Sequence, residues 1–317
     1  MSKQINKNYE LIIIGGGPAG IMAGVYALRS GIKTLLIEKE SYGGQVSTSF
    51  EIKNFLGFDE ISGPELAEKM RQQYANLNGE SLFDEVLSFN KEEDDSKTIV
   101  TAYSGIYNAP TIIFAPGAYP RKLGIEKEEY FNGKGIGYCA ICDGGFYKDK
   151  VVAVVGGGNT AFEDAIYLSN VAKKVYIISR RDKYRAIDAL VKNAKKISER
   201  TKKIEFIVNS NVSKLIGEDY LKSVEITNSL DQKKQILKVD GLFIAVGRIP
   251  ATTLLKDIVD MDNEGYIKAN SNLETNIKGL YVAGDARVKE IRQIITAASD
   301  GAIAATYANN YLNERRS

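Results

Sequence analysis

The fold is decided by the stretch from Leu11 to Glu38, which reads LIIIGGGPAGIMAGVYALRSGIKTLLIE. In this stretch a short apolar run is followed by a glycine turn, an amphipathic segment and a second apolar run. Short apolar runs bounded by glycine are typical of buried parallel strands, and the amphipathic segment between them favours a helix. The stretch therefore predicts a strand–helix–strand unit.

The same pattern recurs from Val152 to Ser179, which reads VAVVGGGNTAFEDAIYLSNVAKKVYIIS. The two stretches align without a gap at a constant offset of 141 residues, so that Leu11 matches Val152 and Glu38 matches Ser179. Two such units predict an α/β protein with two doubly wound, Rossmann-like nucleotide-binding domains.

The limits of the second domain are marked by two strand-like runs that end in turn residues. Thr111 to Phe114 is followed by Ala-Pro-Gly-Ala, and Gly241 to Val246 is followed by Gly247. We place the second domain between these runs, at about 121–247. The charged run from Asn90 to Lys97 is predicted to be the solvated tip of a hairpin.

Length and composition agree with two domains of a soluble globular protein. The chain has 317 residues, of which 44% are apolar and 26% charged, and this length suits about two domains of roughly 150 residues. The net charge of +2 argues against nucleic acid or an anionic membrane as the main partner. No apolar run reaches the ~18 residues of a membrane span, and the polar start lacks the apolar core of a secretory signal, so we expect a cytoplasmic protein.

The first glycine turn has the form Gly15-x-Gly17-x-x-Gly20 and follows a predicted strand. Glycines at this spacing allow a tight turn and a close approach of the backbone to a pyrophosphate, which the helix N-terminus then binds. Glu38 ends the second strand 18 residues after Gly20, near the ~20-residue spacing of an acid that holds a ribose diol. A purely structural turn would not require this acid, so a dinucleotide site is predicted.

The second glycine turn, Gly156-x-Gly158-x-x-Ala161, differs from the first at the ribose position. Because Glu38 aligns with Ser179, the acid is absent there, and Arg180, Arg181 and Arg185 follow. Guanidinium groups bind a 2′-phosphate, which a carboxylate would repel. The second site is therefore predicted to prefer NADPH to NADH, whereas the alternative is a solvated arginine cluster on the surface.

The chemical centre is predicted at Cys139-Ala-Ile-Cys142-Asp143. These two cysteines are the only ones, and the chain has no histidine, so a zinc site lacks ligands and no metal is expected. Two cysteines at this spacing can form a redox-active disulfide, and a helix start lowers the pKa of a thiol. Asp143 is the candidate proton donor and acceptor, because burial would raise its pKa; the alternative is a helix cap.

Near the end of the chain, Gly279 to Asp285 reads as a short strand that ends in Gly-Asp. An aspartate at the end of a strand can bind the hydroxyls of a ribitol chain. Alone, this pattern is equally typical of a simple turn.

These motifs together resemble the low-molecular-weight, bacterial-type thioredoxin reductases, which are FAD-dependent pyridine nucleotide-disulfide oxidoreductases, and the resemblance covers nearly the whole chain. It rests on the two glycine turns, the Cys-Ala-x-Cys-Asp signature, the run SRRDKYRA from Ser179 to Ala186, and the segment from Gly284 to Ala298. It implies contacts to FAD from Gly15, Gly17, Pro18, Ala19, Gly20, Glu38, Gly44, Gln45, Asn54, Gly284, Asp285, Arg292 and Gln293. It implies contacts to NADPH from Gly156, Gly158, Asn159, Thr160, Ala161, Arg180, Arg181 and Arg185.

The resemblance also implies a mechanism. Electrons would pass from NADPH through FAD to the disulfide of Cys139 and Cys142, and then to thioredoxin, with Cys142 as the sulfur on the flavin side. The FAD-binding domain would be discontinuous, formed by 1–120 and 248–317, while 121–247 would carry both the NADPH site and the dithiol. Such proteins are homodimers, and the second domain rotates between the two half-reactions.

The chain departs from the family pattern at three positions. Ser179 stands where histidine is usual, Thr160 where serine is frequent, and Pro116 where threonine is usual. Alternatives to the proposed class are a relative that takes electrons from ferredoxin, a ferredoxin–NADP reductase, which would lack the dithiol, and a non-enzymatic flavin redox sensor, which would need no second nucleotide site.

Overall fold

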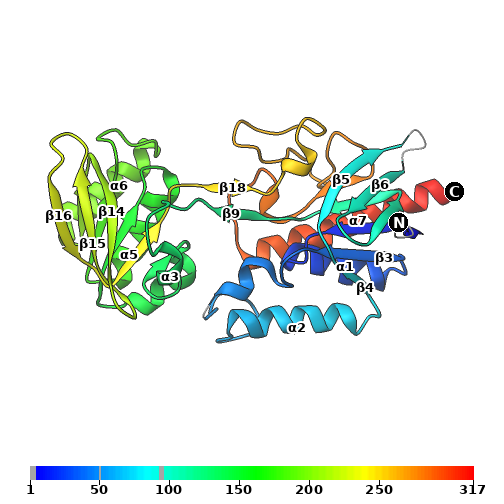
Figure 1. Ribbon diagram of the computed structural model, residues 1–317, viewed down its shortest axis with the longest axis horizontal. Helices are drawn as coiled ribbons and strands as arrows, with labels where there is room; N and C mark the ends of the chain where they lie inside the picture. Colours follow the sequence, from blue (N-terminus) through cyan, green and yellow to red (C-terminus); the bar gives the residue numbers. More distant parts are fainter. Residues whose placement is uncertain (1–4, 50, 93–95) are drawn as a thin grey trace. The chain divides into compact units, whose positions relative to one another are not determined.

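The computed structural model describes residues 5–49, 51–92 and 96–317, and the chain divides into two compact units (Figure 1). The first unit consists of Met1–Tyr119 and Ile249–Ser317, so it is formed by both ends of the chain, and the second is Pro120–Arg248. Two strands at the junctions, β9 (Ala118–Pro120) and β18 (Arg248–Pro250), pair with each other. No helix of the described segments is long and apolar enough to cross a membrane.

The first unit is built on a five-stranded parallel sheet with the order β19-β8-β2-β3-β4. Three long helices pack in this unit, and α1 and α7 lie so close that a Cβ atom on Gly301 would come within 2.1 Å of the Ala19 carbonyl oxygen. The strands are β2 (Leu11–Ile14), β3 (Thr34–Glu38), β4 (Glu80–Phe83), β8 (Thr111–Phe114) and β19 (Leu280–Val282), and the helices are α1 (Pro18–Arg29), α2 (Gly63–Ala75) and α7 (Ile294–Arg316).

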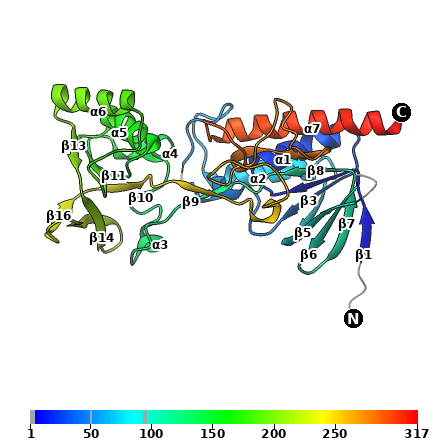
Figure 2. The same cartoon turned by 90° about the horizontal axis from the view of Figure 1, so that it is seen from above.

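Helices α1 and α7 cover one face of this parallel sheet. A four-stranded sheet with the order β1-β7-β6-β5 covers its other face (Figure 2). An apolar core that includes Ile12, Phe89 and Ile99 lies between the two sheets. The strands are β1 (Ile5–Asn8), β5 (Val86–Lys91), β6 (Lys97–Thr101) and β7 (Gly105–Ala109).

The predicted hairpin from Asn90 to Lys97 is formed by β5 and β6, which pair antiparallel. Residues 93–95 lie outside the described residues. The prediction that the whole run is solvated is wrong for Lys97, whose exposed fraction is 0%. Its Nζ donates a hydrogen bond of 2.7 Å to the Pro110 carbonyl oxygen and lies over the Tyr311 ring. The apolar stem of the lysine is therefore part of the protein interior.

The second unit is built on a five-stranded sheet with the order β10-β17-β11-β12-β13, all parallel. Helices α5 and α6 cover one face and an antiparallel sheet, β14-β15-β16, covers the other (Figure 2). The main strands are β10 (Ile136–Gly137), β11 (Val151–Val155), β12 (Lys174–Ile178), β13 (Ile204–Ile207) and β17 (Gly241–Ile244), and the helices are α5 (Asn159–Val171) and α6 (Asp188–Thr201). The antiparallel strands are β14 (Ser210–Gly217), β15 (Leu221–Asn228) and β16 (Lys234–Lys238).

The internal repeat is the common element of the two units, and it confirms the predicted fold class. In the first unit β2, α1 and β3 follow one another, and in the second β11, α5 and β12 do so. Gly17 is the N-cap of α1, and Gly158 is the N-cap of α5 at the equivalent position. Each unit therefore presents a helix N-terminus at the carboxyl end of a buried central strand, where doubly wound folds bind nucleotides.

Candidate functional site

The glycines of the first turn are required for different physical reasons. A Cβ atom on Gly20 would lie 1.8 Å from the Gly15 carbonyl oxygen, so the packing of α1 on the turn excludes any larger residue. At Gly17 the backbone angles are φ −77° and ψ −176°, which any residue adopts, and a Cβ atom would meet nothing within 4 Å. Neither conformation nor packing requires glycine at position 17. The open space in front of the helix N-terminus thus fits a pyrophosphate, which needs this approach to the backbone N–H groups.

Glu38 is held against this turn by its own carboxylate. The side chain is buried, Oε2 accepts a hydrogen bond of 2.5 Å from the N–H of Gly16, and Oε1 accepts one of 2.7 Å from the N–H of Glu40. A carboxylate oxygen has two lone pairs, so both oxygens retain the capacity to accept from a hydroxyl. This geometry fits the predicted contact to a ribose diol.

A short 3-10 helix, η1 (Gly44–Thr48), lies beside the same turn because the Gly16 carbonyl oxygen accepts a hydrogen bond of 2.7 Å from the N–H of Gly43. Gln45 is on this helix, and its Nε2 donates to the Ala118 carbonyl oxygen. The structure therefore brings the predicted residues Gly44 and Gln45 to the glycine turn.

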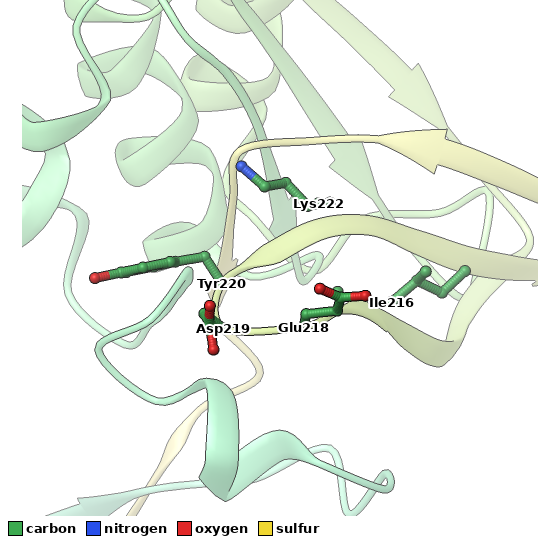
Figure 3. Close-up of a pocket in the computed structure, with 6 residues that line it drawn as sticks. Ile216, Glu218, Asp219, Tyr220 and Lys222 are labelled. Carbon is green, nitrogen blue, oxygen red and sulfur yellow. The ribbon is translucent and has the colours of Figure 1, made fainter.

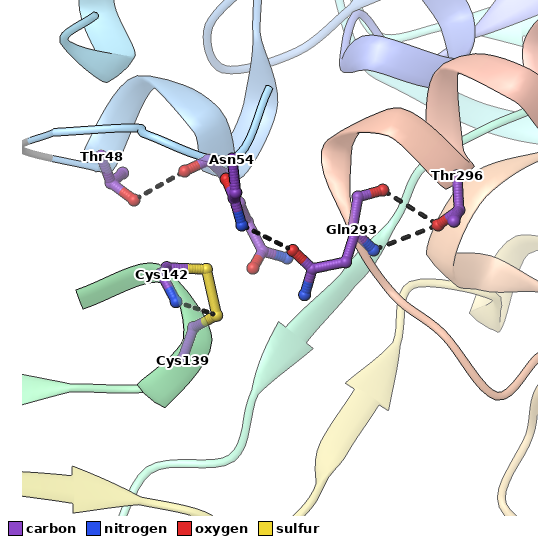
Figure 4. The surroundings of a disulfide bond; sticks show 7 residues. Thr48, Asn54, Cys139, Cys142, Gln293 and Thr296 are labelled. Carbon is purple, nitrogen blue, oxygen red and sulfur yellow. Dashed lines mark hydrogen bonds between the residues drawn. A yellow bond between two sulfur atoms is a disulfide. The ribbon is translucent and has the colours of Figure 1, made fainter. Parts of the chain in front are cut away.

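Asn54 and Gln293, which are far apart in the sequence, are in direct contact. The Asn54 Nδ2 donates a hydrogen bond of 3.2 Å to the Gln293 Oε1 (Figure 4). Gln293 is the N-cap of α7, where it forms a capping box with Thr296. Both predicted cofactor-binding amides are thus fixed at the start of a long helix.

Arg292 carries a buried nitrogen for which the described residues offer no hydrogen-bond partner. Its Nε has no hydrogen-bond partner in the part of the chain that the structure describes, and its guanidinium lies 4.3 Å from the centre of the Tyr266 ring. A buried donor without an acceptor costs about 1–3 kcal/mol. A ligand with acceptor atoms would satisfy it, so Arg292 fits its predicted role at the FAD site.

The Gly284–Asp285 turn is held by a buried acid that the sequence analysis did not single out. Asp300 on α7 is 4% exposed and accepts hydrogen bonds from the Gly284 N–H at 3.0 Å, from Arg287 at 2.9 and 3.0 Å, and from Lys289 at 2.7 Å. One feature of the sequence could have indicated this role. Asp300 is an acid between the small residues Ser299 and Gly301, in a helix whose other buried residues are mostly alanine. Asp300 anchors the turn that presents Asp285.

The second glycine turn repeats the open geometry of the first. Gly158 has φ −97° and ψ −179°, and a Cβ atom there would also meet nothing within 4 Å. Ala161 is fully buried, while Asn159 and Thr160 are exposed at the start of α5. The second unit therefore offers a similar approach to a helix N-terminus.

The arginine loop, defined here as residues 179–186, is folded back onto this second turn. The Gly157 carbonyl oxygen accepts hydrogen bonds from the N–H groups of Arg185 at 2.7 Å and Ala186 at 3.1 Å. Ser179 is buried, and its Oγ donates to the Arg181 carbonyl oxygen at 2.9 Å. Arg180, Arg181 and Arg185 are all exposed. The loop that carries these three exposed cations is thus held against the glycine turn by its backbone, as a site for a phosphate on the ribose would require.

Cys139 and Cys142 form a disulfide in the second unit, with their Cα atoms 5.3 Å apart (Figure 4). Cys139 is the N-cap of the short helix α4 (Ala140–Asp143), and its Sγ accepts a hydrogen bond of 3.2 Å from the N–H of Cys142. A donor directed at this sulfur stabilises its thiolate once the disulfide is reduced. Both cysteines are partly exposed, so a partner can reach them.

Asp143 has the environment that the sequence analysis required of a proton carrier. Burial raises the pKa of its carboxyl to about 6. It is the N-cap residue of η2 (Gly144–Tyr147), yet within the described residues its side chain makes no capping hydrogen bond. The alternative, that the Asp143 side chain serves only as a helix cap, is therefore not supported. A carboxyl with this pKa exchanges its proton near neutral pH.

Among the described residues, neither a metal-binding cluster nor the pocket at the β14–β15 turn adds to the glycine turns or the dithiol. Residues 5–49, 51–92 and 96–317 contain no group of three or more side chains able to bind a metal. A pocket at the β14–β15 turn contains none of the predicted site residues (Figure 3). It is lined by Ile216, Gly217, Glu218, Asp219, Tyr220 and Lys222.

Comparison with known proteins agrees with this geometry. Residues 9–301 match the family model of the pyridine nucleotide-disulphide oxidoreductases. The thioredoxin reductase of Listeria innocua is 42% identical over 311 residues, which cover 97% of this chain and 95% of that protein. The crystal structure of thioredoxin reductase from Streptococcus pyogenes matches with a TM-score of 0.89 and 40% identity, covering 98% of this chain and 100% of that one.

A further relative, the thioredoxin reductase of Bacillus subtilis, is 38% identical and covers 97% of this chain and 96% of that protein. The chain therefore belongs to the pyridine nucleotide-disulphide oxidoreductase family, and within it to the thioredoxin reductases. The resemblance drawn from the motifs is confirmed.

Proposed function

We propose that the protein is an NADPH-dependent thioredoxin-disulfide reductase, in which electrons pass from NADPH through FAD to the Cys139–Cys142 disulfide and then to thioredoxin. The activity and both cofactors are those of the family to which the whole chain belongs. One observation carries the proposal: a disulfide beside a carboxyl with a pKa of about 6 lies in the same unit as a nucleotide-type glycine turn.

We assign FAD to the first unit and NADPH to the second. In the first unit, the open space at Gly17, the Glu38 carboxylate and the unpartnered nitrogen of Arg292 support the assignment. In the second, the open space at Gly158 and the arginine loop support it. When bound, FAD supplies the ability to accept a hydride and to pass two electrons to a disulfide.

The dithiol would act by thiol–disulfide exchange. The Cys139 thiolate attacks one sulfur of the thioredoxin disulfide, forms a mixed disulfide and releases the other sulfur as a thiolate. Cys142 then attacks the Cys139 sulfur, which restores the Cys139–Cys142 bond and releases the second sulfur of thioredoxin. Asp143 would donate and accept the protons of these steps, because its pKa lies near neutral pH.

The second unit would rotate between the two half-reactions. It carries both the nucleotide turn and the dithiol, and a single flavin has to exchange electrons with each in turn. Gly117 and Gly247 flank the two connections with φ of 77° and 110°, and a Cβ atom on either would meet nothing within 4 Å. Backbone of this kind absorbs hinge rotations at low cost.

We also propose that the enzyme is a homodimer, as the resemblance implies, and that it works in the cytoplasm. The near-neutral net charge of +2 supports a protein partner such as thioredoxin rather than nucleic acid or a membrane surface.

The decisive experiment is a stopped-flow reduction of the purified yellow protein by NADPH, with and without a thioredoxin. We expect NADPH to bleach the flavin absorbance and thioredoxin disulfide to restore it. Replacement of either cysteine by serine should leave the bleaching and abolish thioredoxin reduction. Bleaching by reduced ferredoxin but not by NADPH would identify a ferredoxin-dependent relative instead. Bleaching by NADPH without any reduction of thioredoxin would favour a ferredoxin–NADP reductase, and the absence of NADPH turnover would favour a flavin sensor.

A further inference from the structure

Glu128 is a buried acid that accepts hydrogen bonds from the loop just before its own helix. It is 3% exposed and begins the short helix α3 (Glu128–Phe131). Its Oε2 accepts hydrogen bonds from the N–H groups of Gly124 at 2.8 Å and Ile125 at 3.4 Å, and its Oε1 accepts one from Leu123 at 2.9 Å. The carboxylate therefore organises the backbone of the preceding loop.

The fourth donor to Glu128 is the side chain next to the dithiol. The Tyr138 hydroxyl donates a hydrogen bond of 2.9 Å to the Glu128 Oε1. Tyr138 is half-buried, and its burial together with this bond raises the pKa of its hydroxyl, so that the group remains a donor at all physiological pH values. The hydroxyl end of Tyr138 is thus bonded to a carboxylate that three backbone N–H groups also hold.

Tyr138 is also the only residue between strand β10 and Cys139. Gly137 ends β10, which pairs with β17, and Cys139 is the extended N-cap residue of α4 with φ −145° and ψ 100°. The pairing of β10 with β17 ends at Gly137 and does not include Cys139. The anchored side chain of Tyr138 therefore restricts the backbone that carries the Cys139 sulfur.

We propose that Glu128 and Tyr138 are positioning residues that hold Cys139 in place for closure of its disulfide with Cys142, and so keep the reduction potential of the pair low. The inference rests on the proposed redox role of the dithiol. In the oxidised form the disulfide itself restrains Cys139. In the reduced form this restraint is lost and the Tyr138–Glu128 bond remains.

Loss of that bond would increase the conformational freedom of Cys139 more in the reduced form than in the oxidised form, where the disulfide still restrains it. The conformational entropy gained favours the dithiol, so the equilibrium shifts towards reduction and the potential rises. A contact that merely stabilises the fold would affect both forms equally and leave the potential unchanged. The potential therefore separates a positioning role from a structural one.

The test uses Tyr138→Phe, which removes only the hydroxyl. The matched control is Tyr130→Phe, because Tyr130 is an exposed tyrosine of α3 whose hydroxyl makes no hydrogen bond within the described residues. Full-length, FAD-loaded proteins are equilibrated in dithiothreitol buffers. The two thiols of one dithiothreitol form its cyclic disulfide and give two electrons and two protons to the Cys139–Cys142 bond, which becomes two thiols. Alkylation and mass measurement then report this pair alone, since the chain has no other cysteine.

We expect Tyr138→Phe to shift the equilibrium at least threefold towards the dithiol, which is about 14 mV because tenfold is 29.6 mV. Glu128→Gln should shift it in the same direction, and Tyr130→Phe should match the wild type. A Tyr138→Phe potential equal to that of the wild type would overturn the inference, even if the variant melts at a lower temperature. A wild-type dithiol that dithiothreitol titrates but NADPH cannot reduce would contradict the proposed function instead, while the comparison of variants would still decide the inference.

Discussion

The Gly157 carbonyl oxygen accepts a hydrogen bond of 2.7 Å from the N–H of Arg185, which ties the arginine loop to the glycine turn of the second unit. The first unit has a corresponding bond of 2.7 Å from the Gly43 N–H to the Gly16 carbonyl oxygen. Both repeats thus fold a second segment onto the same turn carbonyl. In the first unit Glu38 stands beside that bond, and in the second the segment carries arginines.

The first prediction concerns the choice of nucleotide. Because exposed arginines next to the turn can pair with a 2′-phosphate, we expect kcat/KM for NADPH to exceed that for NADH by at least about tenfold, or ~1.4 kcal/mol. Changing Arg180 and Arg181 together to Gln should raise the KM for NADPH and leave turnover with NADH nearly unchanged. Arg200→Gln, on the exposed last turn of α6, is the matched control. Equal use of both nucleotides by the wild type would refute the assignment.

The second prediction separates the two nucleotide sites with the smallest possible substitution. Gly17→Ala and Gly158→Ala meet no atom within 4 Å and require no unusual backbone angle, so both variants should fold normally. A methyl group in front of the helix N-terminus would obstruct a pyrophosphate. Gly17→Ala should therefore weaken FAD binding by about tenfold or more, measured as flavin released on dilution, while Gly158→Ala should raise the KM for NADPH and retain FAD.

Each variant is the control for the other. If both variants lose FAD equally, or neither affects its nucleotide, the open spaces at the two turns do not receive pyrophosphates.

The elements around the glycine turns could be predicted from the sequence because their signals are local. Strand, turn and helix each depend on residues within one short stretch, and the constant offset of the repeat placed Glu38 and Ser179 at equivalent strand ends. The roles of Glu128 and Asp300 were missed, because each acid accepts a hydrogen bond from a residue ten or more positions away that the fold brings to it. The sequence shows that Asp300 lies between small residues of an alanine-rich helix, but it does not show which donors the acid will meet.

The error at Lys97 has the same origin. A run of charged residues ordinarily indicates solvent, yet the register of β6 directs this lysine inward, where a carbonyl oxygen and an aromatic ring receive its ammonium group. Burial of a single charged residue depends on tertiary packing, which composition cannot report.

The third prediction concerns the stability of the second unit as a function of pH. Asp164 on α5 is 7% exposed, and its pKa is raised to about 7 by burial and by Glu163, against the opposing effect of Arg248. The folded protein therefore binds a proton that the unfolded chain has lost above its ordinary pKa, so the free energy of unfolding falls as pH rises from about 4 to about 7. Asp164→Asn imitates the neutral acid, so the free energy of unfolding of this variant should lack the decrease with pH that Asp164 causes.

Melting temperatures of the wild type and of Asp164→Asn at pH 5 and pH 8 test this prediction. The melting temperature of the variant minus that of the wild type should be several degrees larger at pH 8 than at pH 5. This change corresponds to a free energy on the order of 1–4 kcal/mol. A difference between the two proteins that is independent of pH would show that Asp164 is already ionised throughout.

The last prediction assigns the proton of the dithiol reaction to Asp143. With no histidine in the chain, the carboxyl adjacent to Cys142, with its pKa raised by burial to about 6, is the group placed to carry it. Asp143→Asn should retain FAD and be reduced by NADPH normally, while transfer to thioredoxin falls by about 10², typical of a lost general acid or base. Single-turnover kinetics at the flavin absorbance should show an inflection near pH 6 in the wild type and in the exposed control Asp149→Asn, but not in Asp143→Asn. Wild-type rates in Asp143→Asn from pH 6 to 9 would mean that water delivers the proton and that burial of this acid serves only the packing of α4.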